Sequence, residues 1–359
     1  MQPEKETSKT YPSPLSFVPV TLTSKPTVDR YMRAYGEGSC QHSFTSLFTL
    51  REKYGSMICE RDGFLFILRK GLCRNGERVY LAPIGDEDLK GAYDAILNDA
   101  AAHQCRAVFN TLTENQTAFL KEAFPGRFCY TELRDYAEYI YLTEHLIRMK
   151  GKKLADKRNK INKILRSYGE RLEVRHLGAG DSEEVLRFEE KWFRDNSTNR
   201  DKDALEQEMR TIRLQMEHFD LLGLNGIGVR MDGEMIAFAY GVPLNNSCFD
   251  GLIAKADCTV IPNLYKYLYW QISCICAAPY PYFNWEEDVG VKGLRGIKTE
   301  YGPAVLMRKY LVRENDAPYD FSDPAEISVV SAIDYSMDDP LIPSGIGTLE
   351  KTAFRESGR

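Results

Sequence analysis

The chain has 359 residues, of which 43% are hydrophobic and 28% are charged, and its formal net charge is −5 at pH 7. This composition predicts a folded protein with one large domain or two medium ones. The negative charge argues against a protein that coats nucleic acid with its whole surface, although it allows local basic patches.

No run of 18 consecutive apolar residues is present, so we expect no membrane-spanning helix. The N-terminal residues are polar and lack the apolar core of a secretion signal. The nine cysteines include no C-x-x-C pair. This spacing favours reduced thiols, no metal site and a cytoplasmic location.

The first half of the chain predicts an α/β unit over residues 25–147, after a disordered N-terminus at residues 1–24. Residues 25–38 read as a short helix stopped by glycine. Residues 56–85 read as three strands joined at Asp-Gly and Asn-Gly turns. Helix, strand, helix and strand follow up to residue 142.

The second half repeats this order over residues 148–313: helices, three strands, an apolar helix, a strand, a short helix and a last strand. That is the element order of the GNAT acyltransferase fold, seen twice. The expected fold class is therefore α/β (α+β), with two tandem GNAT-like units, each a mixed and mainly antiparallel sheet flanked by helices. Between Glu314 and Glu350 there is no Lys or Arg, so residues 314–359 read as an acidic, mostly disordered tail.

Residues 148–166 form a basic segment in an acidic chain. Nine of these 19 residues are Lys or Arg. If the segment is helical, its apolar stripe consists of Leu154, Ile161, Leu165 and Tyr168. The segment is then either a solvated helix or a platform for RNA phosphates or anionic lipid headgroups. The candidate nucleic-acid-binding residues are Lys153, Lys157, Arg158 and Lys160.

The junction after the third strand of the second half contains no glycine. In a CoA-dependent GNAT enzyme, a glycine-rich loop at this place holds the pyrophosphate with backbone N–H groups. Here the junction is Cys258–Asn263, which argues against acyl-CoA as donor. Lys255 and Asp257 lie two residues apart, on one face of the strand. They either line a cleft or form an ion pair at the end of the sheet.

The stretch 283–303 gathers polar groups directly after an aromatic strand. Asp288 is placed to cap the following helix, which is a structural explanation for that residue alone. Arg295 and Lys298 are i, i+3 neighbours on this helix. Capping does not account for the whole group, which consists of Asn284, Asp288, Arg295, Lys298 and Tyr301. Functional groups concentrate on loops that rigid strands position, so we expect a site here.

This stretch, together with residues 134–163 and 253–269, resembles the phosphatidylglycerol lysyltransferase C-terminal-domain-like family. The resemblance covers residues 25–313, and its most specific part is N-x-x-x-D-x-G-x-x-G-L-R-x-x-K-x-x-Y-x-P, from Asn284 to Pro303. It implies a tandem GNAT-like fold, similar to Fem-type aminoacyltransferases. The membrane-bound members move an aminoacyl group from tRNA to a lipid headgroup. The chain departs from them because it lacks a multi-helix membrane domain and has Ala254 where the family often has an acid.

The resemblance implies transfer of an aminoacyl group from aminoacyl-tRNA to an unknown small-molecule or lipid-headgroup acceptor, without a cofactor, a metal or a covalent intermediate. Such an enzyme aligns the acceptor, accepts its proton and stabilises an oxyanion. The expected catalytic residues are Asp288, Asn284 and Arg295. The expected substrate-binding residues are Lys298, Tyr301, Lys255, Asp257 and Tyr265. The alternatives are a non-catalytic small-ligand-binding protein on the same fold and a CoA-dependent N-acetyltransferase.

Overall fold

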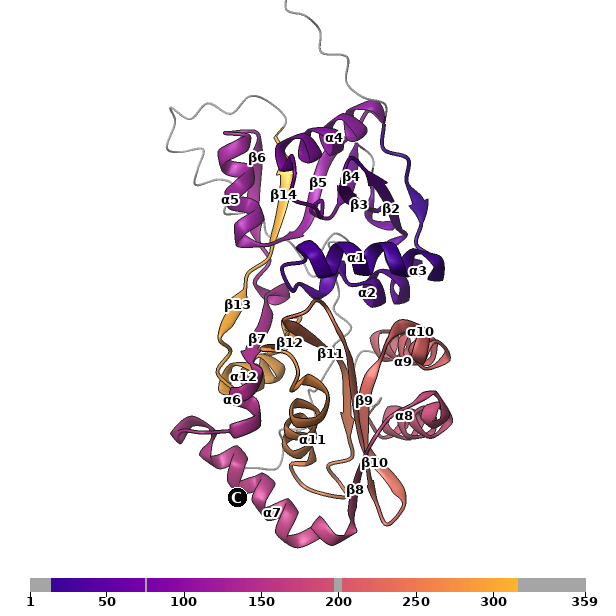
Figure 1. Ribbon diagram of the computed structural model, residues 1–359, viewed down its shortest axis with the longest axis vertical. Coiled ribbons are helices and arrows are strands. Elements are labelled where there is room, and N and C mark those ends of the chain that lie inside the picture. The colour runs from indigo at the N-terminus through magenta and orange to yellow at the C-terminus, as the bar shows by residue number, and fades with distance from the viewer. Residues whose placement is uncertain (1–13, 75, 197–201, 316–359) are drawn as a thin grey trace, which may run out of the picture.

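The computed structural model describes residues 14–74, 76–196 and 202–315, which build two sheets stacked end to end (Figure 1). Each sheet has seven strands, in the orders β1-β2-β3-β4-β5-β14-β6 and β13-β7-β12-β11-β10-β9-β8. We call them sheet A and sheet B. Each contains one parallel pair, β4–β5 in sheet A and β11–β12 in sheet B, while its other pairs are antiparallel. The expected fold class, two mixed sheets flanked by helices, is confirmed.

The strands of sheet A are β1 (Val18–Pro19), β2 (Ser56–Arg61), β3 (Phe64–Arg69), β4 (Glu77–Tyr80), β5 (Arg106–Leu112), β6 (Phe128–Glu132) and β14 (Tyr310–Glu314). Those of sheet B are β7 (Glu138–Leu142), β8 (Leu172–His176), β9 (Asn225–Met231), β10 (Glu234–Pro243), β11 (Cys248–Ala256), β12 (Tyr282–Glu287) and β13 (Val305–Met307). The helices of the first half are α1 (Lys25–Tyr35), α2 (Phe44–Thr49), α3 (Arg51–Tyr54), α4 (Leu89–Ala102), α5 (Glu114–Ala123) and α6 (Thr143–Arg148). Those of the second half are α7 (Ala155–Tyr168), α8 (Ser182–Asn196), α9 (Lys202–Glu217), α10 (Phe219–Leu222), α11 (Leu264–Ile272) and α12 (Lys292–Glu300).

The two halves of the chain exchange a strand. β7 comes from the first half but pairs with β12 and β13 in sheet B. β14 is the last described strand, and it pairs with β5 and β6 in sheet A. Figure 1 shows β14 among the strands of the upper sheet and β7 in the lower sheet, near β12 and β13. Each sheet therefore contains strands from both sides of the boundary between residues 147 and 148. The division into domains at 25–147 and 148–313 stays a prediction.

The segments expected to be disordered are only partly described. Residues 1–13 and 316–359 lie outside the described residues. Residues 14–24, in contrast, include β1 and the buried side chains of Leu15 and Val20. These two side chains join the apolar cores, which explains the order of this stretch.

Helices cover both sheets and join them. Helices α4 and α5 pack on sheet A, α8 to α10 cover one face of sheet B, and α11 and α7 cover the other (Figure 1). Between the sheets, one apolar cluster connects Phe44 of α2 with Phe188 of α8 and Phe238 of β10. Because burial of each such side chain stabilises by about 1.5–3 kcal/mol, this shared core holds the two parts together.

Helix α7 contains most of the basic segment, and its apolar stripe differs from the expected one. Leu154 and Ile161 are buried as expected, but Ile164 is buried whereas Leu165 is 37% exposed. The buried face follows the i, i+3, i+4 spacing of positions 154, 157, 161 and 164, which includes Lys157. The aliphatic stem of a lysine packs well on such a face when its ammonium finds a partner.

Candidate active site in the fork of sheet B

The parallel strands β11 and β12 separate partway along their length. They pair only from Cys248–Tyr282 to Asp250–Asn284. Beyond this point β11 continues beside β10, and β12 continues beside β7. A sheet that divides in this way opens a wedge between its strands, with Asp250 and Asn284 at the apex.

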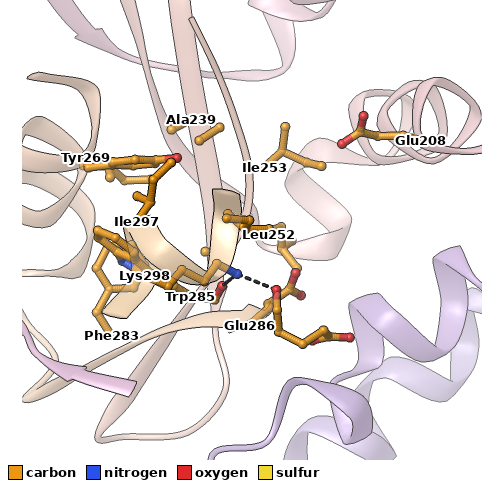
Figure 2. A pocket seen from close by; sticks show the side chains of 15 residues that line it. Glu208, Ala239, Leu252, Ile253, Tyr269, Phe283, Trp285, Glu286, Ile297 and Lys298 are labelled. Carbon is orange, nitrogen blue, oxygen red and sulfur yellow. Dashed lines mark hydrogen bonds between the residues drawn. The ribbon is translucent and has the colours of Figure 1, made fainter. Parts of the chain in front are cut away.

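A narrow pocket with about 60 Å3 of space that water can reach lies in this wedge (Figure 2). One wall comes from Leu252 and Ile253 of β11, and another from Ile297 and Lys298 of α12. The lining is mostly apolar and aromatic, with the exceptions of Glu208, Glu286, Glu287 and Lys298. A mainly apolar hollow with a few charged groups is the usual character of a ligand site.

A bulge in β12 positions the carboxylates. Asn284 lies opposite Ile140 and Glu287 opposite Glu138, so β12 has one residue more than β7 between these pairs. Glu286 takes φ of 55° there, in the left-handed region that non-glycine residues seldom occupy. The Asn284 side-chain oxygen accepts from the Glu286 backbone N–H at 2.8 Å. Strand β12 thus continues through the bulge to Glu287.

The Asn284 amide also holds a buried carboxylate on the side of β12 that faces the first half of the chain. Its Nδ2 donates to Glu138 Oε2 at 2.5 Å and to the Gly38 carbonyl at 3.0 Å. Glu138 also pairs with Lys309 Nζ at 2.7 Å, and all three side chains are fully buried. Burial opposes ionisation, but Lys309 keeps the pKa of Glu138 below its ordinary value. Asn284 is therefore held in place by a charge network that spans both sheets.

Lys298 is placed by the carbonyl groups of the bulge. Its Nζ donates to Trp285 O at 2.5 Å and to Glu287 O at 2.6 Å (Figure 2). Burial lowers the pKa of Lys298, although Glu286 and Glu287 oppose this shift. An ammonium group has three donors. Among the described residues the two carbonyls use two of them, which leaves one N–H for a molecule in the pocket.

The pocket acids are held close together. The Glu287 carboxylate accepts from Gln41 Nε2 at 3.2 Å. The Glu286 carboxylate accepts no hydrogen bond from the described residues, and its side chain lines the pocket. Burial, reinforced by Asp250 and Glu287, raises the pKa of Glu286 well above its ordinary value. A cation in the pocket would remove this penalty.

Asp288 lies outside the pocket, in a dense set of donors. Arg295 binds its two oxygens at 2.9 and 2.7 Å, and Tyr139 donates at 2.7 Å. Arg134 adds a contact at 3.2 Å. Despite burial, these donors hold the pKa of Asp288 below its ordinary value. The side chain does not cap α12, whose N-cap is Val291, because the carboxylate is turned toward Arg295 in the helix.

The remaining expected substrate-binding residues lie around the pocket rather than in it. Lys255 is fully buried against α8 and α9, where it pairs with Glu208 at 2.7 Å. Asp257 accepts from Lys191 of α8 at 2.6 Å. Lys255 and Asp257 therefore do not form an ion pair with each other. The Tyr265 ring lies tilted against the Tyr269 ring, with 5.8 Å between the ring centres. Tyr301 packs on Trp285 at 4.8 Å and supports the pocket wall from behind. Of the expected site residues, Lys298 alone belongs to the pocket lining.

The four basic residues singled out on α7 and before it differ in exposure. Lys153 is exposed, and Lys160 pairs with Asp156 at the surface. Arg158 donates to the Met149 carbonyl at 2.6 Å. Lys157 is only 6% exposed and pairs with Glu300 at 3.0 Å. Its ammonium also lies 4.8 Å from the centre of the Tyr301 ring. Lys157 therefore anchors α7 to the wall of the pocket.

Comparison with known proteins identifies the chain. The sequence profile of the family described as "Phosphatidylglycerol lysyltransferase, C-terminal" matches residues 32–313. The chain belongs to this family. The phosphatidylglycerol lysyltransferase C-terminal fold is thus the tandem GNAT-like fold seen here. No protein with a curated description matches the chain in sequence.

Solved structures agree with the family. A conserved protein of unknown function from Bacteroides thetaiotaomicron is 29% identical, with a TM-score of 0.79 over 84% of this chain and 100% of that chain. L-PGS from Bacillus licheniformis is 14% identical, with a TM-score of 0.58 over 85% of this chain and 95% of that chain. FemX is 10% identical, with a TM-score of 0.53 over 82% of this chain and 97% of that chain. The last two share the fold, which places the chain among lysyltransferase-like and Fem-type folds.

Two features that the sequence singled out can be examined in the structure. No helix in the described parts of the chain is long and apolar enough to cross a bilayer. Ala254, where the family often has an acid, lines the pocket, and so does the carboxylate of Glu208 from α9. An acid is therefore present in the pocket on this side, although it comes from another element.

The β11–α11 junction of this family member offers no phosphate loop. Helix α11 begins after Asn263, which has φ of 67° and makes no side-chain cap bond. Lys266 Nζ donates to Asn263 Oδ1 at 2.8 Å. Pro262 has no N–H to donate. The backbone therefore lacks the row of glycine N–H groups that a CoA pyrophosphate requires.

Sequence reasoning missed five residues that the structure brings to the site: Glu208, Glu286 and Glu287 in the pocket, and Glu138 with Lys309 behind it. The signal for two of them was present, because Glu286 and Glu287 directly follow an aromatic strand. Glu208 lies in an amphipathic helix, where an acid ordinarily faces water. Only the fold shows that its carboxylate points toward Lys255.

Proposed function

We propose that this chain transfers an aminoacyl group from aminoacyl-tRNA to an acceptor, and that the fork pocket receives this group. The observation that carries the proposal is the Glu286 carboxylate, which accepts no hydrogen bond from the described residues and lies beside a mainly apolar pocket wall. An aminoacyl group has an ammonium at one point and a side chain at another. The negative charges of Glu286 and Glu287 complement the ammonium. The apolar walls from β11 and α12 offer contacts to the side chain of the transferred amino acid.

Lys298 is suited to the reacting carbonyl. Two of its donors are fixed by the carbonyls of Trp285 and Glu287, which holds the third in a set direction. In this proposal the third N–H donates to the ester carbonyl oxygen and stabilises the oxyanion. One such preorganised donor contributes on the order of 10²–10³ in rate.

The proposed reaction is a direct displacement. The acceptor oxygen or nitrogen forms a bond to the ester carbonyl carbon, and the bond from this carbon to the ribose oxygen breaks. The acceptor proton passes to the leaving ribose oxygen. Because the ester is already activated, alignment of the two reactants supplies most of the acceleration.

Asp288 and Arg295 have a positioning role in this proposal. The Asp288 carboxylate is occupied by its donors, so it orients Arg295 and Arg134 rather than taking a proton. The side chains of Arg295 and Arg134 are 32% and 38% exposed. Such partly exposed, fixed guanidinium groups suit phosphate oxygens at the acceptor end of tRNA. The exposed lysines of residues 148–166 would hold phosphates farther along.

The test compares one tRNA in its charged and deacylated states. Total tRNA is aminoacylated, half is deacylated with mild base, and both are titrated in filter-binding assays. We expect the charged form to bind at least tenfold more tightly, and the Glu286→Gln variant to lose the difference. Equal affinities would overturn the proposal and favour a non-catalytic ligand-binding protein. Saturable binding of acetyl-CoA would favour the N-acetyltransferase.

A further inference from the structure

Arg69 is a buried cation in sheet A, away from the fork pocket. It ends strand β3, and its side chain is only 1% exposed. Among the described residues it donates to Gln41 alone, from Nη2 to Oε1 at 2.8 Å and to the backbone carbonyl at 3.5 Å, while Nε and Nη1 have no hydrogen-bond partner there. Its guanidinium carbon lies 4.4 Å from the centre of the Tyr54 ring. Buried cations are normally paired with an acid, so the acid that balances Arg69 has to be found.

Gln41 connects this cation to a pocket acid. It belongs to the short 3-10 helix η2 (Cys40–His42) and is buried. Its Nε2 donates to Glu287 Oε1 at 3.2 Å. Glu287 follows the bulge of β12 and lines the fork pocket. A chain of two hydrogen bonds therefore runs from β3 of sheet A to the pocket in sheet B.

The chain has a fixed direction. A guanidinium group only donates hydrogen bonds, an ionised carboxylate only accepts them, and a Gln amide does one at each end. Arg69 holds the amide oxygen, which turns the amide N–H groups toward Glu287. Without Arg69 the amide is free to turn over and to present its oxygen to Glu287, which favours the protonated acid. Arg69 thus selects the charged form of Glu287, because a hydrogen bond to the charged form favours it.

The second oxygen of Glu287 has a weak donor. In the described part of the chain, Oε2 has the Cys40 thiol at 3.6 Å, and a thiol donates weakly. Lys298 donates to the backbone carbonyl of Glu287 rather than to its carboxylate. An ammonium group in the pocket is a much stronger donor than a thiol, and Oε2 is the oxygen that it would find available.

We propose that Arg69 is a positioning residue for the fork pocket, and that it acts through the Gln41 amide, which holds Glu287 as the charged acid that receives the ammonium of the aminoacyl group. Neither Arg69 nor Gln41 belongs to the pocket lining. The same arrangement accounts for the burial of Arg69, since its counter-charge lies one amide away. The inference deepens the proposed function and rests on it, because the ammonium is the ligand group assigned there.

The charges around Glu287 set the sign of the expected effect. Burial and Glu138 raise the pKa of Glu287, and Lys298 and Lys309 oppose this shift. Loss of the Gln41 N–H removes a donor to the charged form and raises the pKa of Glu287 further. The groups that face Glu287 are Glu138 of β7, Asp250 of β11, Glu286 of β12, Lys298 of α12, Lys309 between β13 and β14, Arg69 of β3, the Cys40 thiol and the Tyr136 phenol.

Arg69→Met tests the far end of the chain. The probes are glycinamide, alaninamide and lysinamide, which imitate an aminoacyl ester, and their binding is measured by calorimetric titration at pH 7. We expect affinity to fall roughly tenfold in Arg69→Met. Gln41→Met breaks the chain in the middle and has the same expectation. Wild-type affinity in both variants would overturn the inference.

The pH profile separates positioning from packing. Titrations from pH 5 to pH 8 follow the ionisation of the pocket acids, below the range where the amine of the probe loses its proton. In both variants the acidic limb of the binding curve should move to higher pH by about one unit. A loss of packing lowers affinity by the same factor at every pH. Such a parallel decrease would therefore overturn the positioning role.

A double variant shows whether Arg69 acts through Glu287. Glu287→Gln should weaken binding by itself, and adding Arg69→Met should change the affinity by no more than about twofold. Losses that multiply would overturn the inference. Arg230→Met is the matched control: Arg230 is also a buried arginine on a strand, but it pairs with Asp181 and Glu184 away from the pocket. It should leave amide binding and its pH profile unchanged.

Failure of the inference and failure of the proposed function give different results. Tight amide binding in the wild type that is insensitive to Arg69→Met and Gln41→Met would overturn the role of Arg69 and leave the aminoacyl pocket standing. No binding of any of the three amides to the wild type would contradict the proposed function, and the inference with it.

Discussion

Strand β5 of sheet A and strand β12 of sheet B have the same surroundings in their sheets. Each pairs in parallel with the strand before it and antiparallel with a strand from the other half of the chain. Each has a bulge, and each bulge has one residue in the left-handed region, Thr111 with φ of 57° and Glu286 with φ of 55°. Both sheets therefore contain the same backbone feature, a strand bulge with one residue in the left-handed region.

The side chains at the two bulges differ in kind. The Thr111 hydroxyl donates to the neighbouring Asn110 carbonyl at 2.7 Å and is buried. Aromatic rings fill the core next to it, where Phe109 packs against Tyr93. At Glu286 the same conformation directs a carboxylate toward a pocket. A strained backbone occurs in both sheets, but at the sheet B bulge it coincides with a pocket and with a buried acid of raised pKa, which is the combination typical of a functional site.

The largest effect is expected where the two sheets are tied together. Lys309→Met keeps the length of the side chain but leaves Glu138 buried without its cation. Breaking a buried ion pair in this way costs about 3–5 kcal/mol. Urea unfolding at pH 7 measures the loss. The double variant Lys309→Met with Glu138→Gln should recover most of it, and failure to recover would show that Lys309 acts through packing.

The second prediction sets one bulge against the other. Glu286→Gln removes the carboxylate charge that, in our proposal, binds the ammonium of the aminoacyl group. This change should weaken the binding of an aminoacyl amide such as lysinamide roughly 10- to 100-fold. Thr111→Val keeps a β-branched residue in the same conformation and loses one hydrogen bond. It should cost about 1 kcal/mol of stability and leave binding unchanged. Calorimetric titration and urea unfolding of both variants check this. Equal loss of binding in the two would remove the distinction between the sheets.

The third prediction compares the exposed lysines of residues 148–166 with the buried Lys157. The double variant Lys153→Glu with Lys160→Glu reverses two exposed charges. In a plot of the logarithm of the tRNA binding constant against the logarithm of the salt concentration, it should make the slope shallower by about two. The affinity of the wild type should fall about tenfold or more between 50 and 200 mM salt for a few phosphate contacts. Lys157→Met is the control, because the Lys157 side chain is only 6% exposed, whereas that of Lys160 is 40% exposed. It should leave the salt slope unchanged, and filter binding at several salt concentrations decides between the two.

The sequence predicts the elements of this fold well because they depend on local signals. Asp-Gly turns delimit the strands at Asp62 and Asp232, and both aspartates have positive φ. The exchange of β7 and β14 has no such signal, since strand partners depend on the whole chain. The same holds for the boundary of β12, which a bulge extends past Asn284.

The stretch expected to hold the site contributes to the fork pocket, but mostly through residues other than the expected ones. The stretch 283–303 does contain the pocket residues Glu286, Glu287 and Lys298. Asn284 and Asp288 are directed elsewhere, because alternation along a strand and the bulge send adjacent side chains to different sides. Glu138 and Lys309 could not be paired from the sequence, since they are far apart in the chain. The expectation that Lys157 lies on an open face overlooks that a helix repeat can bury a lysine that has an acidic partner.

The smallest effect is expected at the end of the exchanged strand. Residues 316–359 are too polar to add much core, so truncation after Asn315 should change the melting temperature by no more than about 2 °C. Truncation after Arg313 is the matched comparison, because it also removes Glu314 and Asn315, whose side-chain Nδ2 donates to the Gly126 carbonyl at 2.9 Å. This carboxylate accepts from Arg127 Nη2 at 2.8 Å and from the Ala107 N–H at 3.2 Å. Removing it leaves a buried backbone donor without a partner, which costs about 1–3 kcal/mol. Thermal unfolding of both truncations distinguishes the contribution of β14 from that of the tail, and a large drop in the first would mean that the tail docks on the folded part.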